Sequence, residues 1–195
     1  MNKLLWNLKT RYYKLFRSFY PFQRILNKEN SNLVTLINQV ELKGKSVLDL
    51  GVGTGNVLEY LNGAKSIIGL DFTYSMLLEA RESYPNLPFI QADALSIPVK
   101  TKSMDMITAV GLIEYIKDII PFFEETCRIL KNGGCLVLTF SPANFWTRMR
   151  LLLGHPIYVR TSDQLKGVIQ QYNFQIIDYQ QSMMQHQVLL QKSVE

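Results

Sequence analysis

A glycine turn that follows an aspartate is the feature of this sequence that best fits binding chemistry. Gly51, Gly53 and Gly55 follow the end of an apolar run, and Asp49 lies two residues before the first of them. Glycines allow a sharp turn and let the backbone approach a ligand closely. A dinucleotide site spaces its glycines G-x-G-x-x-G and holds a pyrophosphate at a helix N-terminus. Here the spacing is G-x-G-x-G. The Asp49 carboxylate would repel a phosphate, but it suits a ligand with a cationic amino group.

Two more acids follow the next two apolar runs and extend the same kind of site. Asp71 comes about 20 residues after the glycine turn, where an acid can accept hydrogen bonds from ribose hydroxyls. Phe72 and Met76 follow it and can lie against a purine face. Asp93 can accept from the exocyclic amino group of adenine. Each acid alone also fits a helix cap or a loop, but the set favours S-adenosylmethionine, which has a cationic amino group and no phosphate.

A parallel sheet is needed to bring these residues together, and the sequence predicts one. From residue 45 onward, apolar strand-like runs alternate with helical stretches, which is typical of βαβ units with strands buried on both faces. The expected strands are residues 46–50, 66–70, 88–91, 104–109 and 134–140, and the expected helices are residues 56–61, 74–83, 119–130 and 162–172.

The end of the chain breaks this alternation. Residues 174–179 and 184–191 are strand-like runs with no helix between them, so they predict an antiparallel pair on one side of the sheet. The stretch Asn132-Gly133-Gly134 is expected to end the helix before the fifth strand. Residues 141–160 form a long connection, and long connections in compact domains are often functional.

The stretch Asp49-Leu50-Gly51-Val52-Gly53-Thr54-Gly55, taken with Asp71 and Asp93, resembles the class I S-adenosylmethionine-dependent methyltransferases. The likeness covers about residues 42–190 and includes Leu130-Lys131-Asn132-Gly133-Gly134 and the terminal antiparallel pair. Within that family the chain is most similar to the small methyltransferases that include ubiquinone/menaquinone and phospholipid methylases. The resemblance implies an α/β fold, namely a Rossmann-like, doubly wound, mostly parallel seven-stranded sheet with an antiparallel C-terminal strand and helices on both faces.

The resemblance also implies a role for each motif residue. Asp49 would lie near the amino group of the cofactor, the three glycines would pass under its methionine part, and Asp71 would hold the ribose hydroxyls. The other implied contacts are Phe72 and Met76 at the adenine faces, Asp93 and the Ala94 amide at the adenine edge, and the turn from Val110 to Glu114 beside the methyl group and the acceptor.

The expected reaction requires little acid–base chemistry from the protein. Methyl transfer from a sulfonium is an in-line displacement, so the protein mainly supplies orientation and desolvation. A general base is needed only if the nucleophile starts protonated. The candidates are Glu114, Tyr115 and His155, whose commoner structural roles are a helix N-terminal carboxylate, a packing residue and a surface loop residue. His186 falls in a terminal strand away from the expected site and is set aside.

The positive charge of the chain belongs to its N-terminal segment. The net charge of the 195 residues is +5, yet seven basic residues precede the first acid, Glu29, and the remainder has 14 basic and 16 acidic residues. Residues 3–20 place apolar groups at helical spacing among Lys and Arg, which predicts an amphipathic helix that ends before Pro21. A second helix is expected over residues 32–40. We expect residues 1–41 to form a helical appendage to a cofactor domain over residues 42–195.

Two segments can cover an acceptor, namely the N-terminal helix and the connection at residues 141–160. The helix and residues 145–153 mix apolar groups with Lys or Arg and lack acids, which fits a membrane interface, an apolar lid or plain packing. We expect a small hydrophobic or amphiphilic acceptor, such as a lipid, a quinone or an aromatic metabolite. We also expect a cytoplasmic enzyme that contacts the inner membrane surface through residues 3–20.

Other classes of function fit less well. The basic N-terminal residues are interleaved with aromatic ones and can contact RNA phosphates and stack on bases, but the rest of the chain is slightly acidic. The Asn-Pro-Pro-Tyr and Asp-Pro-Pro-Tyr motifs of amino-group methylation in nucleic acids are absent. A non-catalytic scaffold that binds a partner through the N-terminal helix is a second alternative. Cys127 and Cys135 are too few for a disulfide framework or a metal cluster, and no run approaches the ~18 apolar residues of a membrane span.

Overall fold

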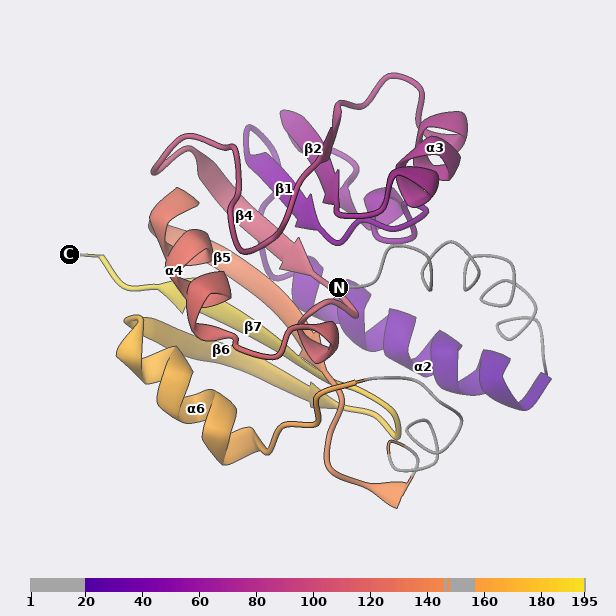
Figure 1. Ribbon diagram of the computed structural model, residues 1–195, viewed down its shortest axis with the longest axis vertical. Helices are drawn as coiled ribbons and strands as arrows, with labels where there is room; N and C mark the ends of the chain where they lie inside the picture. Colours follow the sequence, from indigo (N-terminus) through magenta and orange to yellow (C-terminus); the bar gives the residue numbers. More distant parts are fainter. Residues whose placement is uncertain (1–19, 146, 148–156, 195) are drawn as a thin grey trace.

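Seven strands form one sheet within residues 20–145, 147 and 157–194, which the computed structural model describes (Figure 1). The order of the strands is β3-β2-β1-β4-β5-β7-β6. Strands β1 to β5 pair in parallel, and β7 runs antiparallel to both β5 and β6. This arrangement confirms the predicted fold class. The strands are β1 (Ser46–Leu50), β2 (Ser66–Asp71), β3 (Phe89–Gln91), β4 (Met104–Ala109), β5 (Leu130–Phe140), β6 (Phe174–Gln181) and β7 (His186–Lys192).

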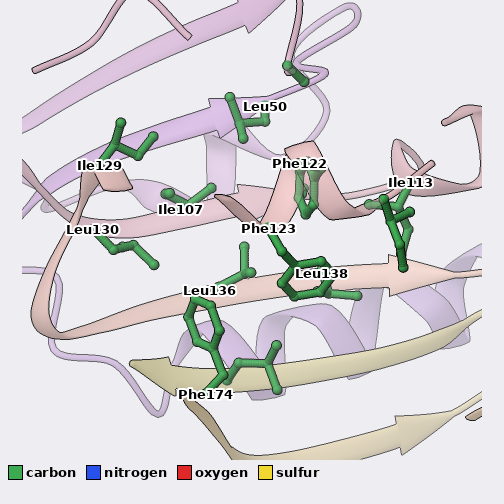
Figure 2. Close-up of a cluster of buried hydrophobic side chains, with 14 of the residues drawn as sticks. Leu50, Ile107, Ile113, Phe122, Phe123, Ile129, Leu130, Leu136, Leu138 and Phe174 are labelled. Carbon is green, nitrogen blue, oxygen red and sulfur yellow. The ribbon is translucent and has the colours of Figure 1, made fainter. Parts of the chain in front are cut away.

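Helices cover both faces of the sheet. On one face, α4 and α6 bury Phe122, Phe123 and Leu165 in an apolar cluster that also contains Leu138 of β5 (Figure 2). On the other face, α2, η1 and α3 bury a second cluster. The sheet is therefore doubly wound, as predicted. The helices are α2 (Tyr20–Ile37), the short 3-10 turn η1 (Leu58–Leu61), α3 (Tyr74–Ser83), the 3-10 turn η2 (Ile113–Tyr115), α4 (Ile120–Ile129) and α6 (Ser162–Gln171).

The two helical layers explain why the strands are continuous apolar runs. In β1, Val47 packs in the cluster on the α2 side, whereas Leu48 and Leu50 pack in the cluster under α4 and α6. Successive side chains of a strand point to opposite faces, so both sets must be apolar when both faces are covered. The same alternation directs Asp49 toward the α2 face, and this residue is 1% exposed.

Helix α2 differs from its prediction. A helix was expected over residues 32–40 after a break at Pro21, but the described helix runs Tyr20–Ile37 and contains Pro21 in its first turn. Proline is tolerated there because the first backbone N–H groups of a helix have no partner within the helix. Leu36 and Ile37 are fully buried in the second cluster. The amphipathic helix predicted before Pro21 lies outside the described residues.

The glycines before the fifth strand also play a different part from the predicted one. Helix α4 ends at Ile129, and β5 begins at Leu130, so Gly133 and Gly134 lie inside the strand rather than ending the helix. Gly133 has a φ of +74°, and the β4–β5 pairing shifts register between Met104 and Met106. Both are features of a β-bulge. The helix expected over residues 56–61 is only the short turn η1. Among the described helices, none is both long and apolar enough to cross a bilayer.

Candidate functional site

The carboxyl ends of the parallel strands meet at one edge of the sheet, which is where ligands bind in open α/β folds. Asp71 ends β2, Ala109 ends β4 and Phe140 ends β5. Because β7 runs antiparallel to β5, its first residue, His186, pairs with Phe140 at this same edge. In Figure 1 the turn between β6 and β7 lies on the side toward which β4 and β5 point.

The glycine turn leaves β1 and immediately contacts β2. The amides of Gly51 and Val52 both donate to the Leu70 carbonyl, at 2.8 and 3.0 Å. Gly53 has a φ of +54°, and a Cβ there would meet nothing closer than its own turn, at 3.9 Å. Gly55 has a φ of +90°, and a Cβ there would lie 2.9 Å from the Tyr84 ring. The turn therefore has one open side, at Gly53, and one tightly packed side, at Gly55.

Asp49 is a buried carboxylate, and only one of its two oxygens has a hydrogen-bond partner among the described residues. Its Oδ1 accepts a 2.6 Å hydrogen bond from the Thr108 hydroxyl of β4, whereas its Oδ2 has no hydrogen-bond partner among the described residues. Burial raises the pKa of this carboxyl to about 7, the Thr108 bond opposes the rise, and the charge of Asp71 adds to it. An unpartnered carboxylate oxygen in a buried position fits a ligand that brings its own positive charge.

Asp71 fastens the glycine turn to the end of β2. Its Oδ2 accepts from the Gly53 amide at 2.9 Å, and its Oδ1 accepts from the Thr73 amide at 2.8 Å. Burial raises the pKa of the Asp71 carboxyl, while the backbone amides oppose the rise. The Thr73 hydroxyl and the Phe72 amide also hydrogen-bond to this carboxylate, so a ligand hydroxyl would share its oxygens with these donors. Sequence analysis missed the Gly53 contact, because nothing in the spacing indicates it.

The residues predicted to hold adenine lie on two adjacent segments. The Ala92 amide donates to the Asp71 carbonyl at 3.1 Å, so the end of β3 lies beside the loop that carries Phe72 and leads to Met76. Met76 and Ala94 are buried, Phe72 is half-buried and Asp93 is exposed, with its Oδ1 accepting from the Leu95 amide at 3.0 Å. The structure thus places the segments that carry these four residues side by side, and their roles at the adenine stay predictions.

Gln91 is a further member of this region that sequence analysis missed. Its Nε2 donates to the Phe72 carbonyl at 3.1 Å and ties the two segments together. The only available signal was its position at the end of a strand.

The loop after β4 is tied to the end of β5. The Gly111 amide donates to the Thr139 hydroxyl at 2.7 Å. The Ser141 hydroxyl donates to Oε2 of Glu114 at 2.7 Å, and Glu114 is 2% exposed. Val110 and Tyr115 are half-buried. The predicted loop therefore lies at the correct edge, with its acid turned inward onto Ser141.

Arg160 holds this loop from the other side and was not predicted. It is 8% exposed, and its guanidinium donates to the carbonyls of Ile113 at 2.7 Å, Lys117 at 3.2 Å and also Ile116. The Tyr158 amide donates to the Glu114 carbonyl at 2.6 Å. The chain that returns from the long connection is thus docked against η2. His155 and residues 3–19 lie outside the described residues.

His186 lies at the carboxyl edge, so setting it aside was wrong. Its Nδ1 is hydrogen-bonded to the Tyr179 hydroxyl, which is in turn 3.1 Å from the Ser162 hydroxyl of α6. Its ring meets that of Phe140 edge-on at 5.3 Å. The reason for the error is the antiparallel direction of β7, which brings the start of the strand, not its end, to the carboxyl edge. No three His, Cys, Asp or Glu side chains gather as metal ligands within residues 20–145, 147 and 157–194.

Comparison with known proteins agrees with this geometry. Residues 48–138 match the family described as a methyltransferase domain. A demethylmenaquinone methyltransferase of Lactococcus lactis is 32% identical over 112 residues, which are 53% of this chain and 44% of that protein. A malonyl-[acyl-carrier protein] O-methyltransferase of Marinomonas sp. is 30% identical over 130 residues, 64% of this chain and 46% of that protein. The chain thus spans less than half the length of these relatives.

A solved structure supports the fold. Magnesium protoporphyrin IX methyltransferase from Synechocystis PCC 6803, with bound SAH, superposes with a TM-score of 0.74 at 14% sequence identity, covering 90% of this chain and 88% of that one. At this identity the likeness establishes the shared architecture.

Proposed function

Because the chain carries a class I methyltransferase domain of the S-adenosylmethionine-dependent type, we propose that it transfers a methyl group to a small hydrophobic or amphiphilic acceptor at the carboxyl edge of the sheet. The observation that carries this proposal is the buried Asp49 carboxylate with its unpartnered Oδ2, directly before the open glycine turn. A pyrophosphate would be repelled there, whereas the cationic amino group of S-adenosylmethionine neutralises the charge.

The other cofactor contacts belong to the same proposal. The open side of the turn at Gly53 faces no side chain, and the half-buried Asp71 carboxylate bonds to the Gly53 amide, where it can also accept from ribose hydroxyls. Phe72 and Met76 provide apolar surface for the adenine, and Asp93 and the Ala94 amide provide polar groups for its edge. When bound, the cofactor supplies a methyl group activated on a sulfonium. The chain's own residues then have to orient the acceptor and exclude water.

The acceptor side of the edge is lined by apolar groups. Phe145, Tyr158 and Met183 are 70%, 44% and 48% exposed. Tyr158 lies against the loop after β4, since its amide donates to the Glu114 carbonyl. Asn144, the residue before Phe145, donates to the Met183 carbonyl at 2.8 Å, so Phe145 and Met183 lie on adjoining segments. Exposed apolar groups beside a site favour an apolar ligand. By their names, the relatives given above act on demethylmenaquinone and on malonyl-[acyl-carrier protein].

The roles of Glu114, Tyr115 and His155 stay predictions within this proposal. Glu114 accepts from Ser141, which supports a part in shaping the loop that faces the acceptor. The division of the chain at residues 41 and 42 is likewise a proposal, and α2 contributes Leu36 and Ile37 to the core beyond that division.

Calorimetry with S-adenosylmethionine tests the cofactor site. The wild-type chain should bind, Asp49→Asn should bind more weakly because it offers no negative charge, and Asp71→Ala should lose most of the affinity. Asp163→Asn is the matched control, because Asp163 is an exposed carboxylate on α6 whose contact is a 3.8 Å pair with Lys166. A wild-type chain that does not bind the cofactor would overturn the proposal.

A transfer screen tests the acceptor class. Labelled S-adenosylmethionine is offered with separate lipid, quinone, small-phenol and RNA pools. We expect label in an apolar pool, whereas label confined to RNA would favour the alternative of RNA methylation.

A further inference from the structure

His186 and Tyr179 form a half-buried, hydrogen-bonded pair that the cofactor site does not use. Tyr179 lies on β6 and His186 on β7, and both face the α4 and α6 side of the sheet, where Tyr179 packs beside the apolar cluster. Their side chains share a hydrogen bond at Nδ1 of the imidazole, and the rings stand at 79° to each other. The other ring nitrogen, Nε2, has no hydrogen-bond partner among the described residues. One ring nitrogen is thus held in place while the other remains available.

The position of His186 relates it to the acceptor side of the edge. The residue before it, Gln185, places its Nε2 4.0 Å from the point that a Cβ on Gly111 would occupy. Its strand partner is Phe140, and the next residue, Ser141, donates to Glu114. Gln185, beside His186 along the chain, and Ser141, the residue after its strand partner Phe140, thus both lie against the loop after β4. His186 lies between these two contacts.

We propose that His186 is the general base of the acceptor site, that Tyr179 positions it, and that the acceptor carries an acidic hydroxyl on an aromatic ring. This inference rests on the proposed methyl transfer and adds the substrate class to it. A base is useful only where the nucleophile starts protonated, as a phenol or quinol does. A carboxylate acceptor arrives ionised and needs none.

The proton balance fixes the hydrogen positions. The acceptor O–H bond breaks and its proton goes to Nε2 of His186. The electrons left on the acceptor form the bond to the methyl group, and the sulfonium sulfur keeps the electron pair of the broken C–S bond. Nε2 must therefore start as an acceptor, so Nδ1–H donates to the Tyr179 hydroxyl, which donates to Ser162. The imidazolium then releases its proton to solvent.

The surroundings of His186 favour the neutral imidazole that this step requires. The group that titrates and contacts it is the Tyr179 phenol of β6, while β5 contributes the Phe140 ring and α6 contributes, through Tyr179, the Ser162 hydroxyl. Burial lowers the pKa of the His186 imidazole. The base is therefore free to accept a proton at neutral pH.

Imidazole NMR of the full chain tests the tautomer without any turnover. With ¹⁵N-labelled histidine and S-adenosylmethionine present, His186 should be neutral at pH 7 and protonated at Nδ1, and His155→Gln assigns the signals because the chain has two histidines. Tyr179→Phe should weaken the preference for the Nδ1–H tautomer, whereas Tyr172→Phe, which removes a hydroxyl that bonds to Glu124, should leave it unchanged. A wild-type His186 protonated at Nε2 overturns the proposal.

Turnover supplies the second test, with a reduced naphthoquinone that carries a short isoprenoid side chain as the probe. His186→Gln should lower kcat by about 100-fold or more, with cofactor affinity and thermal unfolding near those of the wild type. Raising the pH should restore part of the rate, because the probe then ionises without a base. Tyr179→Phe should shift the acid limb of the pH–rate profile, and Tyr172→Phe should not. An unchanged rate and profile in His186→Gln overturns the base.

The outcomes separate this inference from the proposed function. A chain that binds S-adenosylmethionine but methylates only carboxylates or amines keeps the proposed function and overturns the hydroxylated aromatic acceptor. A chain that does not bind the cofactor overturns the proposed function itself, and the tautomer measurement still decides how His186 is held.

Discussion

Asp49 is buried and the nearby Asp71 is half-buried, so the two carboxylates are electrostatically unfavourable in the absence of a ligand. Burial disfavours the charged form of each, and the charge of Asp71 further raises the pKa of Asp49. Asp71 is partly compensated by two backbone amides, whereas Asp49 has only the Thr108 hydroxyl. The cationic group of a ligand would therefore stabilise Asp49 more than Asp71.

The stability of the ligand-free protein should fall as the pH rises toward neutrality. The pKa of Asp49 is about 7 in the folded chain against an ordinary value of 3.8, so between these values the folded state binds more protons than the unfolded state. At ~1.4 kcal/mol per pKa unit, the loss is on the order of 4 kcal/mol at most. Asp49→Asn removes this dependence, so thermal unfolding measured across the window should fall less steeply with pH than in the wild type. Parallel curves would contradict the assignment, because Asp71 is present in both proteins.

The same ionisation should make cofactor binding depend on pH. If the bound amino group requires the Asp49 carboxylate, the affinity for S-adenosylmethionine should rise with pH up to about 7, by at most ~10-fold per unit. Calorimetry at several pH values measures this slope. Asp49→Asn should bind weakly and with a smaller slope, and a wild-type affinity that is independent of pH would show that Asp49 does not ionise on binding.

At the scale of elements, the glycine turn depends on close packing as well as on backbone conformation. Gly55→Ala places a Cβ 2.9 Å from the Tyr84 ring at a φ of +90°. A Cβ at Gly63 would have nothing within 4 Å, at a similar φ of +96°. Gly63→Ala is therefore the matched control that measures only the cost of the backbone conformation. We expect about 1–2 kcal/mol of destabilisation in Gly63→Ala and about 1–3 kcal/mol more in Gly55→Ala, measured by denaturant unfolding. Equal losses would show that Tyr84 moves aside freely.

Elements with a strong local pattern could be predicted from the sequence. β1 and β4 match their predicted bounds, as does α3, because continuous apolar runs and helical spacing record burial on both faces of the sheet. The bulge in β5 could not be predicted, since a glycine pair in sequence fits a helix end and a strand bulge equally. The helix predicted in the region of α2 began too late for a similar reason. A proline fits both the end and the first turn of a helix.

The site could be predicted only where its residues lie at strand ends. Asp49 and Asp71 lie within the last two residues of β1 and β2, and Asp93 follows β3, so the parallel sheet alone brings them to one edge. Gln91 and Arg160 donate hydrogen bonds to backbone carbonyls of distant segments. Such contacts produce no recognisable pattern in the sequence. The position of His186 could be predicted only from the direction of β7. That direction follows from pairing across the sheet rather than from any local pattern in the sequence.

At the scale of the whole molecule, α2 connects the basic N-terminal segment to the acceptor side. Ser182, in the turn between β6 and β7, donates to Oε1 of the buried Glu29 at 2.8 Å, and Gln187 donates to the Glu29 carbonyl at 3.0 Å. Asn32 donates to the Gln181 carbonyl at 3.4 Å. In Figure 1, the part of α2 before these contacts extends away from the sheet. The seven basic residues before Glu29 are therefore joined to a helix that is fixed beside the carboxyl edge.

This attachment predicts binding to anionic membranes with the acceptor side facing the lipid. A basic amphipathic segment gains about 1 kcal/mol per Lys or Arg near an anionic surface, and the exposed Phe145 and Met183 add apolar contacts. The full chain should float with phosphatidylglycerol vesicles, less so with phosphatidylcholine vesicles, and less at high salt because the charges are screened.

Changing Lys3, Lys9 and Lys14 to Glu leaves four basic and three acidic residues before Glu29 and alters no described contact. Flotation should therefore be lost while cofactor binding persists. The matched control changes Lys100, Lys102 and Lys166 to Glu, which applies the same charge change to exposed lysines of the cofactor domain. If both triple variants float equally well, the N-terminal segment does not direct the chain to membranes. Loss of flotation in the N-terminal variant alone would show that this segment binds the chain to anionic membranes.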